Sequence, residues 1–243
     1  MIKKVYNKAL FYLKVLLSKF YQYKKNYPVG TKNWLIHQEI RFGGFKNKIV
    51  RNNVSKYDHR SPEELKIGGM TGGDRMLFHG YAKNYSKFLH KFVQNRFKEF
   101  NILEIGILQG TGLAIWSELF PNSNIYGADI DINYFKSNIN FLKSNGAFKN
   151  KNPYIFEFDQ LETGHQNIKS FEKYFFDIVI DDGLHSKDAI LNTFNIFFEK
   201  LNLGGLYIIE DVKFDLIKEL NLSLEEACIF NFDQLYIIEK NED

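Results

Sequence analysis

The sequence predicts an α/β protein built on a mainly parallel β-sheet that ends in an antiparallel hairpin. From Asn101 onward, short apolar runs alternate with stretches of helical character, which is typical of a parallel sheet covered by helices on both faces. The last two apolar runs, residues 227–232 and 235–239, are separated by two residues. A connection this short requires a hairpin, so the seventh strand must run antiparallel to its neighbour.

Each apolar run in this region is expected to form one strand. The expected strands are residues 102–105, 125–128, 154–158, 177–180, 206–209, 227–232 and 235–239. The helix before the fifth strand is expected to end in the segment 201–205, where two glycines follow one another. A chain of 243 residues with 44% hydrophobic content can bury one substantial core. We therefore expect one α/β domain at residues 68–243, preceded by an extension at residues 1–67.

The first part of that extension is basic. Residues 1–25 contain seven lysines and no acidic residue, interleaved with apolar positions, which predicts a basic amphipathic helix. The apolar run at residues 9–13 stops at Lys14, far short of the ~20 residues that span a bilayer. Two interpretations remain open: peripheral contact with an anionic membrane or a partner, and packing on the domain or a sister subunit. Residues 27–60 show little periodicity and are expected to form a cap or lid.

The bulk composition excludes some partners. With 32 basic and 29 acidic residues, the chain gives no reason to expect nucleic acid as a partner. Cys228 is the only cysteine, which excludes an internal disulfide and fits a reducing, cytoplasmic location. We expect it to be buried in its strand. A homo-oligomer is compatible with the aromatic content but is required by no feature.

A glycine-rich loop follows the first expected strand, at residues 106–112. Gly106 and Gly110 allow the backbone to turn sharply and to approach a ligand closely, and Thr111 follows them. Asp129 follows the next strand and could accept hydrogen bonds from both hydroxyls of a ribose. The alternative is that Asp129, or Asp131, caps the helix expected to begin near residue 132.

Two acidic clusters follow later strands. The first is Asp181-Asp182-Gly183-Leu184-His185 and the second is Glu210-Asp211. If their strands are neighbours, three carboxylates and an imidazole surround one cleft, which is the composition of a site for a hard metal ion with a base beside it. Each acid alone is equally well explained as a loop or helix-cap residue, and the histidine as an ordinary structural residue. Their joint placement favours the site.

The seven strands and the terminal hairpin resemble class I S-adenosylmethionine-dependent methyltransferases over about residues 68–240. Leu108 stands where a dinucleotide-binding fingerprint needs its second glycine, which supports this family over dehydrogenases. The resemblance implies a Rossmann-like seven-stranded sheet and S-adenosylmethionine as cofactor. It also implies a set of cofactor residues: Glu104 near the ammonium group or ordering the loop around it, Gly106, Gly110 and Thr111 in the loop that approaches the cofactor, Asp129 at the ribose, Asp159 and Gln160 near the adenine, and Asp181 as a secondary candidate. Asp159 is nearly as well explained as a helix cap.

The acidic clusters resemble those of divalent-metal-dependent sugar O-methyltransferases of the macrolide-tailoring type. The resemblance implies that Asp182, Glu210 and Asp211 bind Mg²⁺ or Mn²⁺ and that His185 is the general base. A stretch before the domain resembles the family's pocket-lining segment and implies the substrate residues Asp74, Arg75, His79, Tyr81 and Tyr85, with arginine where lysine is usual.

The expected acceptor is a sugar or a nucleotide-activated sugar, for instance a heptose destined for a capsule or another surface polysaccharide. Lys46, Lys48 and Arg51 could hold its diphosphate, although a solvated charge run is equally consistent. The alternatives are a small phosphorus-containing, amine or phenolic acceptor, or a cofactor-binding partner subunit without catalytic activity.

Overall fold

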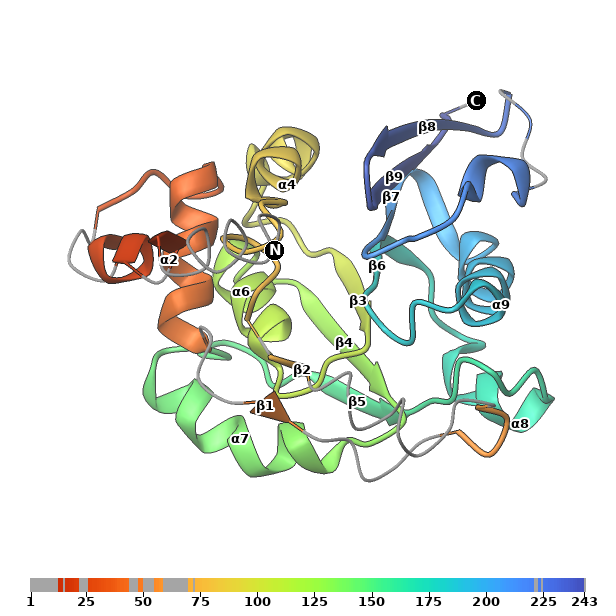
Figure 1. Cartoon of the computed structure of the whole chain (residues 1–243), viewed down its shortest axis with the longest axis horizontal. Coiled ribbons are helices and arrows are strands. Elements are labelled where there is room, and N and C mark those ends of the chain that lie inside the picture. Colours follow the sequence, from red (N-terminus) through yellow and green to blue (C-terminus); the bar gives the residue numbers. More distant parts are fainter. Residues whose placement is uncertain are drawn as a thin grey trace, which may run out of the picture.

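The computed structural model describes residues 13–14, 16–21, 26–43, 48–49, 55–58, 70–71, 73–220, 223 and 225–242. A seven-stranded sheet runs through the molecule, with helices on both of its faces (Figure 1). Its strands are β3 (Asn101–Ile105), β4 (Asn124–Asp129), β5 (Tyr154–Glu157), β6 (Phe176–Asp181), β7 (Leu201–Ile209), β8 (Ala227–Phe232) and β9 (Leu235–Lys240). A separate pair consists of β1 (Lys48–Ile49) and β2 (Met70–Thr71).

The strand order in the sheet is β5-β4-β3-β6-β7-β9-β8. Pairing among β3 to β7 is parallel, whereas β9 lies between β7 and β8 and is antiparallel to both. The α/β fold and the terminal hairpin predicted from the sequence are confirmed. From β3 the chain first adds β4 and β5 on one side of the sheet and then β6 and β7 on the other side. Ligands usually bind at the carboxyl ends of the strands where the order reverses in this way, here those of β3, β4 and β6.

The start of β7 differs from the prediction. The preceding helix, α9 (Lys187–Phe198), ends three residues before Leu201, where β7 already pairs with β6. The register shifts between Phe176 and Ile178, and Gly204 has a φ of 70° within the irregular stretch. The two glycines that suggested a helix end therefore belong to a strand irregularity, where glycine is also favoured.

The helices cover the two faces of the sheet unequally. One face carries α2 (Lys32–Phe42), α4 (Ala82–Phe88), α5 (His90–Val93), α6 (Thr111–Leu119) and α7 (Asn133–Ser144). The other carries α9 and the short 3₁₀ helices η1 (Lys169–Phe171) and η2 (Leu216–Lys218), with α8 (His165–Ile168) directly before η1. Each face has its own apolar core, because successive residues of a strand point to opposite faces.

This alternation separates the carboxylates of the strand ends. Glu104 of β3 and Glu210, directly after β7, contact residues before or within α4 on the first face. Asp181, the last residue of β6, is linked through Gln160 to Thr193 of α9 on the second face. The acidic residues of the motifs therefore do not all belong to one group.

Helix α2 lies within the segment that was expected to form a cap without clear structure. Thr31 caps it by accepting a hydrogen bond from the backbone N–H of Trp34, and seven of its eleven residues are buried. A helix that is buried around most of its circumference shows no amphipathic period, so its pattern could not reveal it. It shares the core of the first face. The expected boundary at residues 67 and 68 lies outside the described residues, as do Lys46, Arg51 and the side chain of Lys48.

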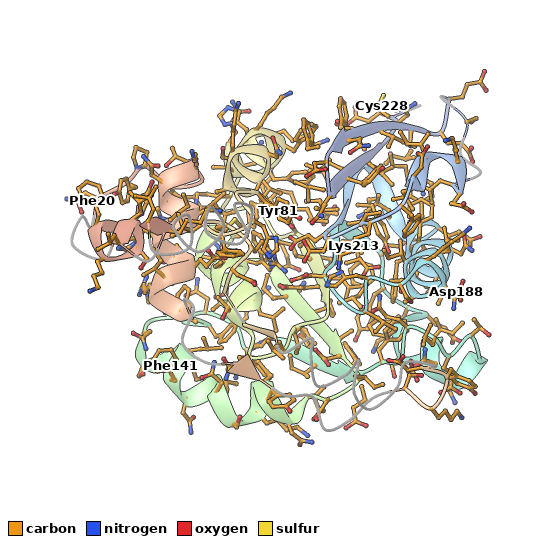
Figure 2. All side chains as sticks on the ribbon, viewed as in Figure 1. Phe20, Tyr81, Phe141, Asp188, Lys213 and Cys228 are labelled. Atoms are coloured by element: carbon orange, nitrogen blue, oxygen red, sulfur yellow. The ribbon has the colours of Figure 1, made fainter. Side chains whose placement is uncertain are left out.

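The described part of the amino-terminal segment, residues 13–14 and 16–21, is helical and lies at the outer edge of the molecule beyond α2 (Figure 1). One side of it contacts the protein: the Lys14 ammonium donates to the Phe78 carbonyl oxygen, and the Tyr21 hydroxyl donates to Asn33 Oδ1 at 3.2 Å. Four apolar side chains at helical spacing are exposed: Leu13 (52%), Leu16 (64%), Leu17 (41%) and Phe20 (62%) (Figure 2). We call these four residues the apolar stripe.

Among the described residues, no helix has both the length and the apolar character required to cross a membrane. Cys228 lies in a strand as predicted, but the prediction that it is buried is wrong, because its side chain is exposed (Figure 2). It lies on β8, the edge strand of the sheet, on which one side faces solvent.

Candidate functional site

The predicted cofactor and metal residues gather at the carboxyl ends of five neighbouring strands, β5, β4, β3, β6 and β7, and the predicted substrate residues lie before or within α4. They form two adjoining parts: a cavity beside β3 and β4, and a cluster of charged side chains beside β3, β6 and β7. We refer to the second part as the acid cluster, which consists of Glu104, Asp182, Glu210 and Asp211 with the groups that contact them.

The cavity holds about 410 Å³ of empty space, including its open mouth. Its lining combines apolar side chains, such as Phe158 and Leu184, with the carboxylates of Asp129 and Asp159. The full lining is Ser55, Asp58, Ile105, Gly106, Asp129, Ile130, Phe158, Asp159, Gln160, Gly183 and Leu184. A flat apolar wall beside carboxylate acceptors suits the base and the hydroxyl groups of a nucleoside.

The glycine-rich loop joins the cavity to the acid cluster. Gly106 has a φ of 83°, and a Cβ atom at this position would lie 2.1 Å from the carbonyl oxygen of Asp182. Gly110 has a φ of 81° and packs against Phe135 equally closely. Thr111, the first residue of α6, is buried beside Gly43. Only glycine permits both the left-handed backbone and these contacts, so the loop lies directly against the Asp182 backbone.

Asp129 fixes this loop from the side of β4. One oxygen of its carboxylate accepts the Leu108 N–H at 2.9 Å and the other accepts the Asp131 N–H at 3.0 Å. It does not cap α7, whereas Asp131 accepts the Asn133 N–H at 3.1 Å at the start of that helix. Asp131 precedes the N-cap residue Ile132 and contacts only the first residue of the helix, and Asp129 remains at the wall of the cavity.

Asp159 and Gln160 line the cavity after β5, the neighbour of β4. Asp159 accepts hydrogen bonds from the Ser55 hydroxyl at 2.6 Å and from the Leu161 N–H at 3.0 Å. The Gln160 amide donates to Asp181 Oδ1 at 2.8 Å and accepts the Leu184 N–H at 2.7 Å. Gln160 thus has both ends of its amide engaged within the protein.

Ser55 and Asp58 line the cavity, although nothing in the sequence pointed to them. They lie in the amino-terminal extension and follow no strand, so only the folded chain brings them to the cavity. Ser55 is 7% exposed and holds residues 55–58 against the wall through its bond to Asp159.

Arg75 lies at the centre of the acid cluster. Its Nη2 atom is 2.7 Å from Glu104 Oε1 and 2.7 Å from Asp182 Oδ2, and its Nε atom is 2.7 Å from Glu210 Oε1 and 2.9 Å from Oε2. The Arg75 side chain is 8% exposed. One guanidinium therefore contacts carboxylates that follow or end three different strands.

Both glutamates also accept a hydrogen bond from an aromatic side chain. Trp116 Nε1 donates to Glu104 Oε2 at 2.7 Å, and the Tyr85 hydroxyl donates to Glu210 Oε1. Burial raises the pKa of Glu104 and, much more strongly, the pKa of Glu210, and the positive charge of Arg75 opposes both shifts. Arg75 is thus the compensating charge that keeps these buried carboxylates in the fold.

Asp211 has a different set of partners. Its Oδ1 atom accepts from the Tyr81 hydroxyl at 2.6 Å and lies 3.4 Å from His79 Nδ1. His79 Nε2 lies 3.5 Å from Asp74. Burial lowers the pKa of His79, but Asp74 and Asp211 outweigh it and raise the pKa overall. Figure 2 shows Tyr81 near the centre of the molecule. All five predicted substrate residues therefore lie in or beside the acid cluster.

Helix α2 holds the turn that carries Arg75. The Glu39 carboxylate accepts the Met76 N–H at 2.7 Å and the Leu77 N–H at 2.9 Å. Glu39 is 1% exposed, and burial raises its pKa to about 8. Sequence reasoning missed this role of Glu39, because a single glutamate within a helix is usually a solvated surface residue.

Three side chains of the site are close enough together to hold one metal ion. Among the described residues, Asp182, His185 and Asp211 each offer one ligand atom, and these atoms lie within 4.8 Å of one another. Two carboxylate oxygens and an imidazole nitrogen suit a divalent cation. Glu210 is not in this group, and Arg75 and Tyr85 contact its oxygens. The predicted role of Glu210 as a ligand would require Arg75 to release it.

Two residues of this donor group have a strained backbone. The φ of His185 is 59° and that of Asp211 is 55°, which places both in the left-handed region. The conformation costs about 1 kcal/mol for a residue with a Cβ atom and often marks functional sites. His185 Nε2 lies 3.6 Å from Asp182 Oδ1. Burial raises the pKa of Asp182, and Arg75 and His185 oppose that shift.

Asp181 was expected to face the cofactor, but it does not line the cavity. Its Oδ1 atom accepts from Gln160 and, at 3.3 Å, from the Gly183 N–H. Oδ2 and the hydroxyl of Tyr207 are buried without a hydrogen-bond partner among the described residues. Burial raises the pKa of Asp181 to about 7. Its place as the last residue of β6 turns its side chain toward α9, so it supports the wall of the cavity from behind.

No protein-family model matches the chain. Mycinamicin VI 2''-O-methyltransferase of Micromonospora griseorubida is 29% identical over 143 residues, which cover 56% of this chain and 32% of the relative. A tetracenomycin rhamnosyl 2'-O-methyltransferase of Streptomyces olivaceus is 24% identical over 151 residues, covering 58% of this chain and 35% of the relative. The chain thus aligns with about a third of the length of these curated relatives. The resemblance to sugar O-methyltransferases inferred from the motifs is confirmed.

Among solved structures, the MycE methyltransferase from the mycinamycin biosynthetic pathway, in complex with Mg, SAH and mycinamycin VI, superposes with a TM-score of 0.51. It is 20% identical, and the match covers 66% of this chain and 48% of that one. At this identity the match shows a shared fold.

The titration of Asp181 can be tested with Asp181→Asn, which keeps the oxygen that Gln160 and Gly183 use. The ordinary pKa of an aspartate is near 3.8, and that of Asp181 is about 7 in the folded protein. Between these values the unfolded chain loses a proton that the folded chain keeps, so the wild type loses stability as pH rises. Relative to Asp181→Asn, its free energy of unfolding should fall by up to about 3 kcal/mol between pH 5 and pH 7. Urea unfolding in the presence of a chelator measures this difference, and a difference that is constant with pH would contradict the assignment.

Proposed function

We propose that the protein is an S-adenosylmethionine-dependent O-methyltransferase that uses a divalent metal ion and acts on a sugar hydroxyl. The observation that carries the proposal is the direct contact between a nucleoside-sized cavity and a compact group of metal donors, joined at Gly106 and Asp182. Sequence similarity to sugar O-methyltransferases supports the same reaction class.

The cofactor would lie in the cavity along the glycine-rich loop. Asp129 is placed to accept from the ribose hydroxyls, and Phe158 and Leu184 offer an apolar surface to the adenine. Asp159 can accept from the amino group of the adenine, while Gln160 and Asp181 support this wall. Glu104, near the end of β3, would meet the ammonium end only by exchanging its contacts with Arg75 and Trp116.

The metal ion would be held by Asp182 and Asp211, and it would supply Lewis-acid stabilisation of the developing alkoxide. His185 Nε2 would act as the general base that accepts the proton of the sugar hydroxyl. The cofactor, when bound, would supply the activated methyl group to the hydroxyl oxygen and would leave as a neutral thioether that keeps the electron pair of the broken S–CH₃ bond. Tyr81 and His79 hold Asp211 in place.

The acceptor is proposed to be a nucleotide-activated sugar, for example a heptose that enters a capsule or another surface polysaccharide. Support for a sugar comes from similar enzymes whose names give a rhamnosyl tetracenomycin as the molecule that they methylate. The donor residues Asp182 and Asp211 leave coordination positions for a pair of acceptor hydroxyls, because Mg²⁺ usually takes six oxygen ligands.

Replacing His185 with alanine tests the proposed chemistry. Transfer of labelled methyl groups to a panel of nucleotide-activated sugars, in the presence of Mg²⁺, should fall by about 10²–10⁴-fold because the base is lost. S-adenosylhomocysteine binding should be unchanged, since His185 does not line the cavity. His90→Ala, at an exposed position of α5, is the matched control and should keep full activity. Unchanged transfer in His185→Ala would remove His185 as the base, and loss of Mn²⁺ binding would make it a ligand.

The amino-terminal helix is proposed to contact an anionic membrane surface, which would place a cytoplasmic enzyme at the inner face of the membrane. The apolar stripe is exposed while the other side of the helix contacts the protein. The first acidic residue of the chain is Glu39, so the basic residues around the stripe have no acidic neighbours in sequence. Apolar side chains flanked by lysines bind anionic lipid headgroups by burial and by charge attraction together.

Co-sedimentation with vesicles tests this contact. The full chain should bind vesicles that contain phosphatidylglycerol, bind less in high salt, and remain free with pure phosphatidylcholine. Leu16→Ser combined with Phe20→Ser should abolish binding. Phe97→Ser combined with Leu203→Ser is the matched control, because these residues are 66% and 55% exposed elsewhere. Binding by the stripe variant, or no binding by the wild type, would refute the membrane contact. A dimer that dissociates only in the stripe variant would identify a subunit interface instead.

A further inference from the structure

Arg75 and a metal ion would compete for the same carboxylates. The Arg75 guanidinium contacts Asp182, which belongs to the compact donor group, and both oxygens of Glu210, which does not. Asp211, in contrast, is bound by Tyr81 and lies near His79 and has no contact with Arg75 among the described residues. Arg75 therefore contacts both oxygens of Glu210 but only Oδ2 of Asp182, whose Oδ1 atom lies 3.6 Å from His185 Nε2.

The shape of the guanidinium makes this arrangement specific. Its Nε and Nη2 atoms point in fixed directions within one plane, so a single side chain contacts Glu210 through Nε while Nη2 contacts Glu104 and Asp182. A lysine ammonium is a point charge and lacks this planar fork. The ring of Trp116 lies 5.7 Å from the guanidinium carbon and further restricts its position.

From this geometry we infer that Arg75 is a resident cation that withholds Glu210 from the metal ion and limits the affinity of the site. Resting on the proposed function, the inference assigns Arg75 a positioning role in place of the substrate contact expected from the sequence. A site with fewer protein carboxylates leaves more coordination positions to the acceptor, and it holds the metal more weakly until the acceptor arrives.

Arg75 also connects the metal donors to the cofactor part of the site. Its Nη2 atom touches Glu104 and Asp182 at the same distance, 2.7 Å. A positive group bound to Glu104 would weaken the contact between Glu104 and Arg75. A metal ion bound to Asp182 would likewise weaken the contact between Asp182 and Arg75. Occupancy of the two parts is therefore coupled, and by linkage the coupling acts equally in both directions.

Mn²⁺ binding, followed by electron paramagnetic resonance, measures the effect without reference to activity. Arg75→Met should bind Mn²⁺ about tenfold more tightly than the wild type, because Glu210 becomes available as a ligand. Glu210→Gln alone should leave Mn²⁺ affinity near that of the wild type. The double variant should also return to that value, since the released carboxylate is absent. Arg41→Met, which removes an arginine that pairs with Glu118 outside the acid cluster, is the matched control.

Arg75→Met leaves buried carboxylates without a compensating charge, so Arg75→Lys provides a second test that keeps the charge. It should bind Mn²⁺ more tightly than the wild type by a smaller factor. Equal Mn²⁺ affinity in the wild type and in folded Arg75→Met and Arg75→Lys would overturn the inference. A large loss of Mn²⁺ affinity in Glu210→Gln, with Arg75 present, would overturn it as well.

S-adenosylhomocysteine binding in the same samples separates the two proposals. Absence of this binding refutes the proposed function, whereas normal cofactor binding with unchanged Mn²⁺ affinity refutes the role of Arg75 alone. Normal cofactor binding without Mn²⁺ binding in any variant refutes both the metal site and that role.

Discussion

The buried ion cluster around Arg75 is the interaction on which the arrangement of the site depends. Burying several carboxylates at adjoining strand ends is unfavourable unless a positive charge compensates them, and one guanidinium supplies that charge to Glu104, Asp182 and Glu210. Glu39 of α2 in turn holds the turn that carries Arg75. The amino-terminal extension therefore belongs to the site through a chain of contacts, although its residues lie outside the alternating α/β pattern.

The alternation of side chains along the strands decides which acids belong to this cluster. Glu104 and Glu210 lie on the face covered by α2, α4 and α6, whereas Asp181 faces α9 and holds Gln160. Asp182 is the residue directly after β6, so its backbone meets Gly106 while its side chain reaches Arg75. Asp181 and Asp182 are thus neighbours in sequence, but the carboxylate of Asp181 supports the cavity wall and that of Asp182 belongs to the proposed metal site.

Much of this could be predicted from the sequence, because it depends on local patterns. Alternating apolar runs and the two-residue connection of the hairpin predicted the sheet, and acidic residues after apolar runs predicted which edge carries the site. The buried helix α2 was not predictable, since it lacks an amphipathic period, and the strand at Leu201 was obscured by glycines typical of a helix end. The pairing of Arg75 with Glu210 joins residues 135 positions apart, and no local pattern reports such a contact.

The central claim is that the carboxyl edge of the sheet binds S-adenosylmethionine in the cavity beside the metal donors. Calorimetric titration of the folded full chain with S-adenosylhomocysteine tests it most directly, performed once in chelator and once with Mg²⁺. We predict saturable binding at one site per chain in both conditions, because the cavity walls do not include the metal donors Asp182, His185 and Asp211. Absence of binding in a sample whose fold is verified by circular dichroism would contradict the account.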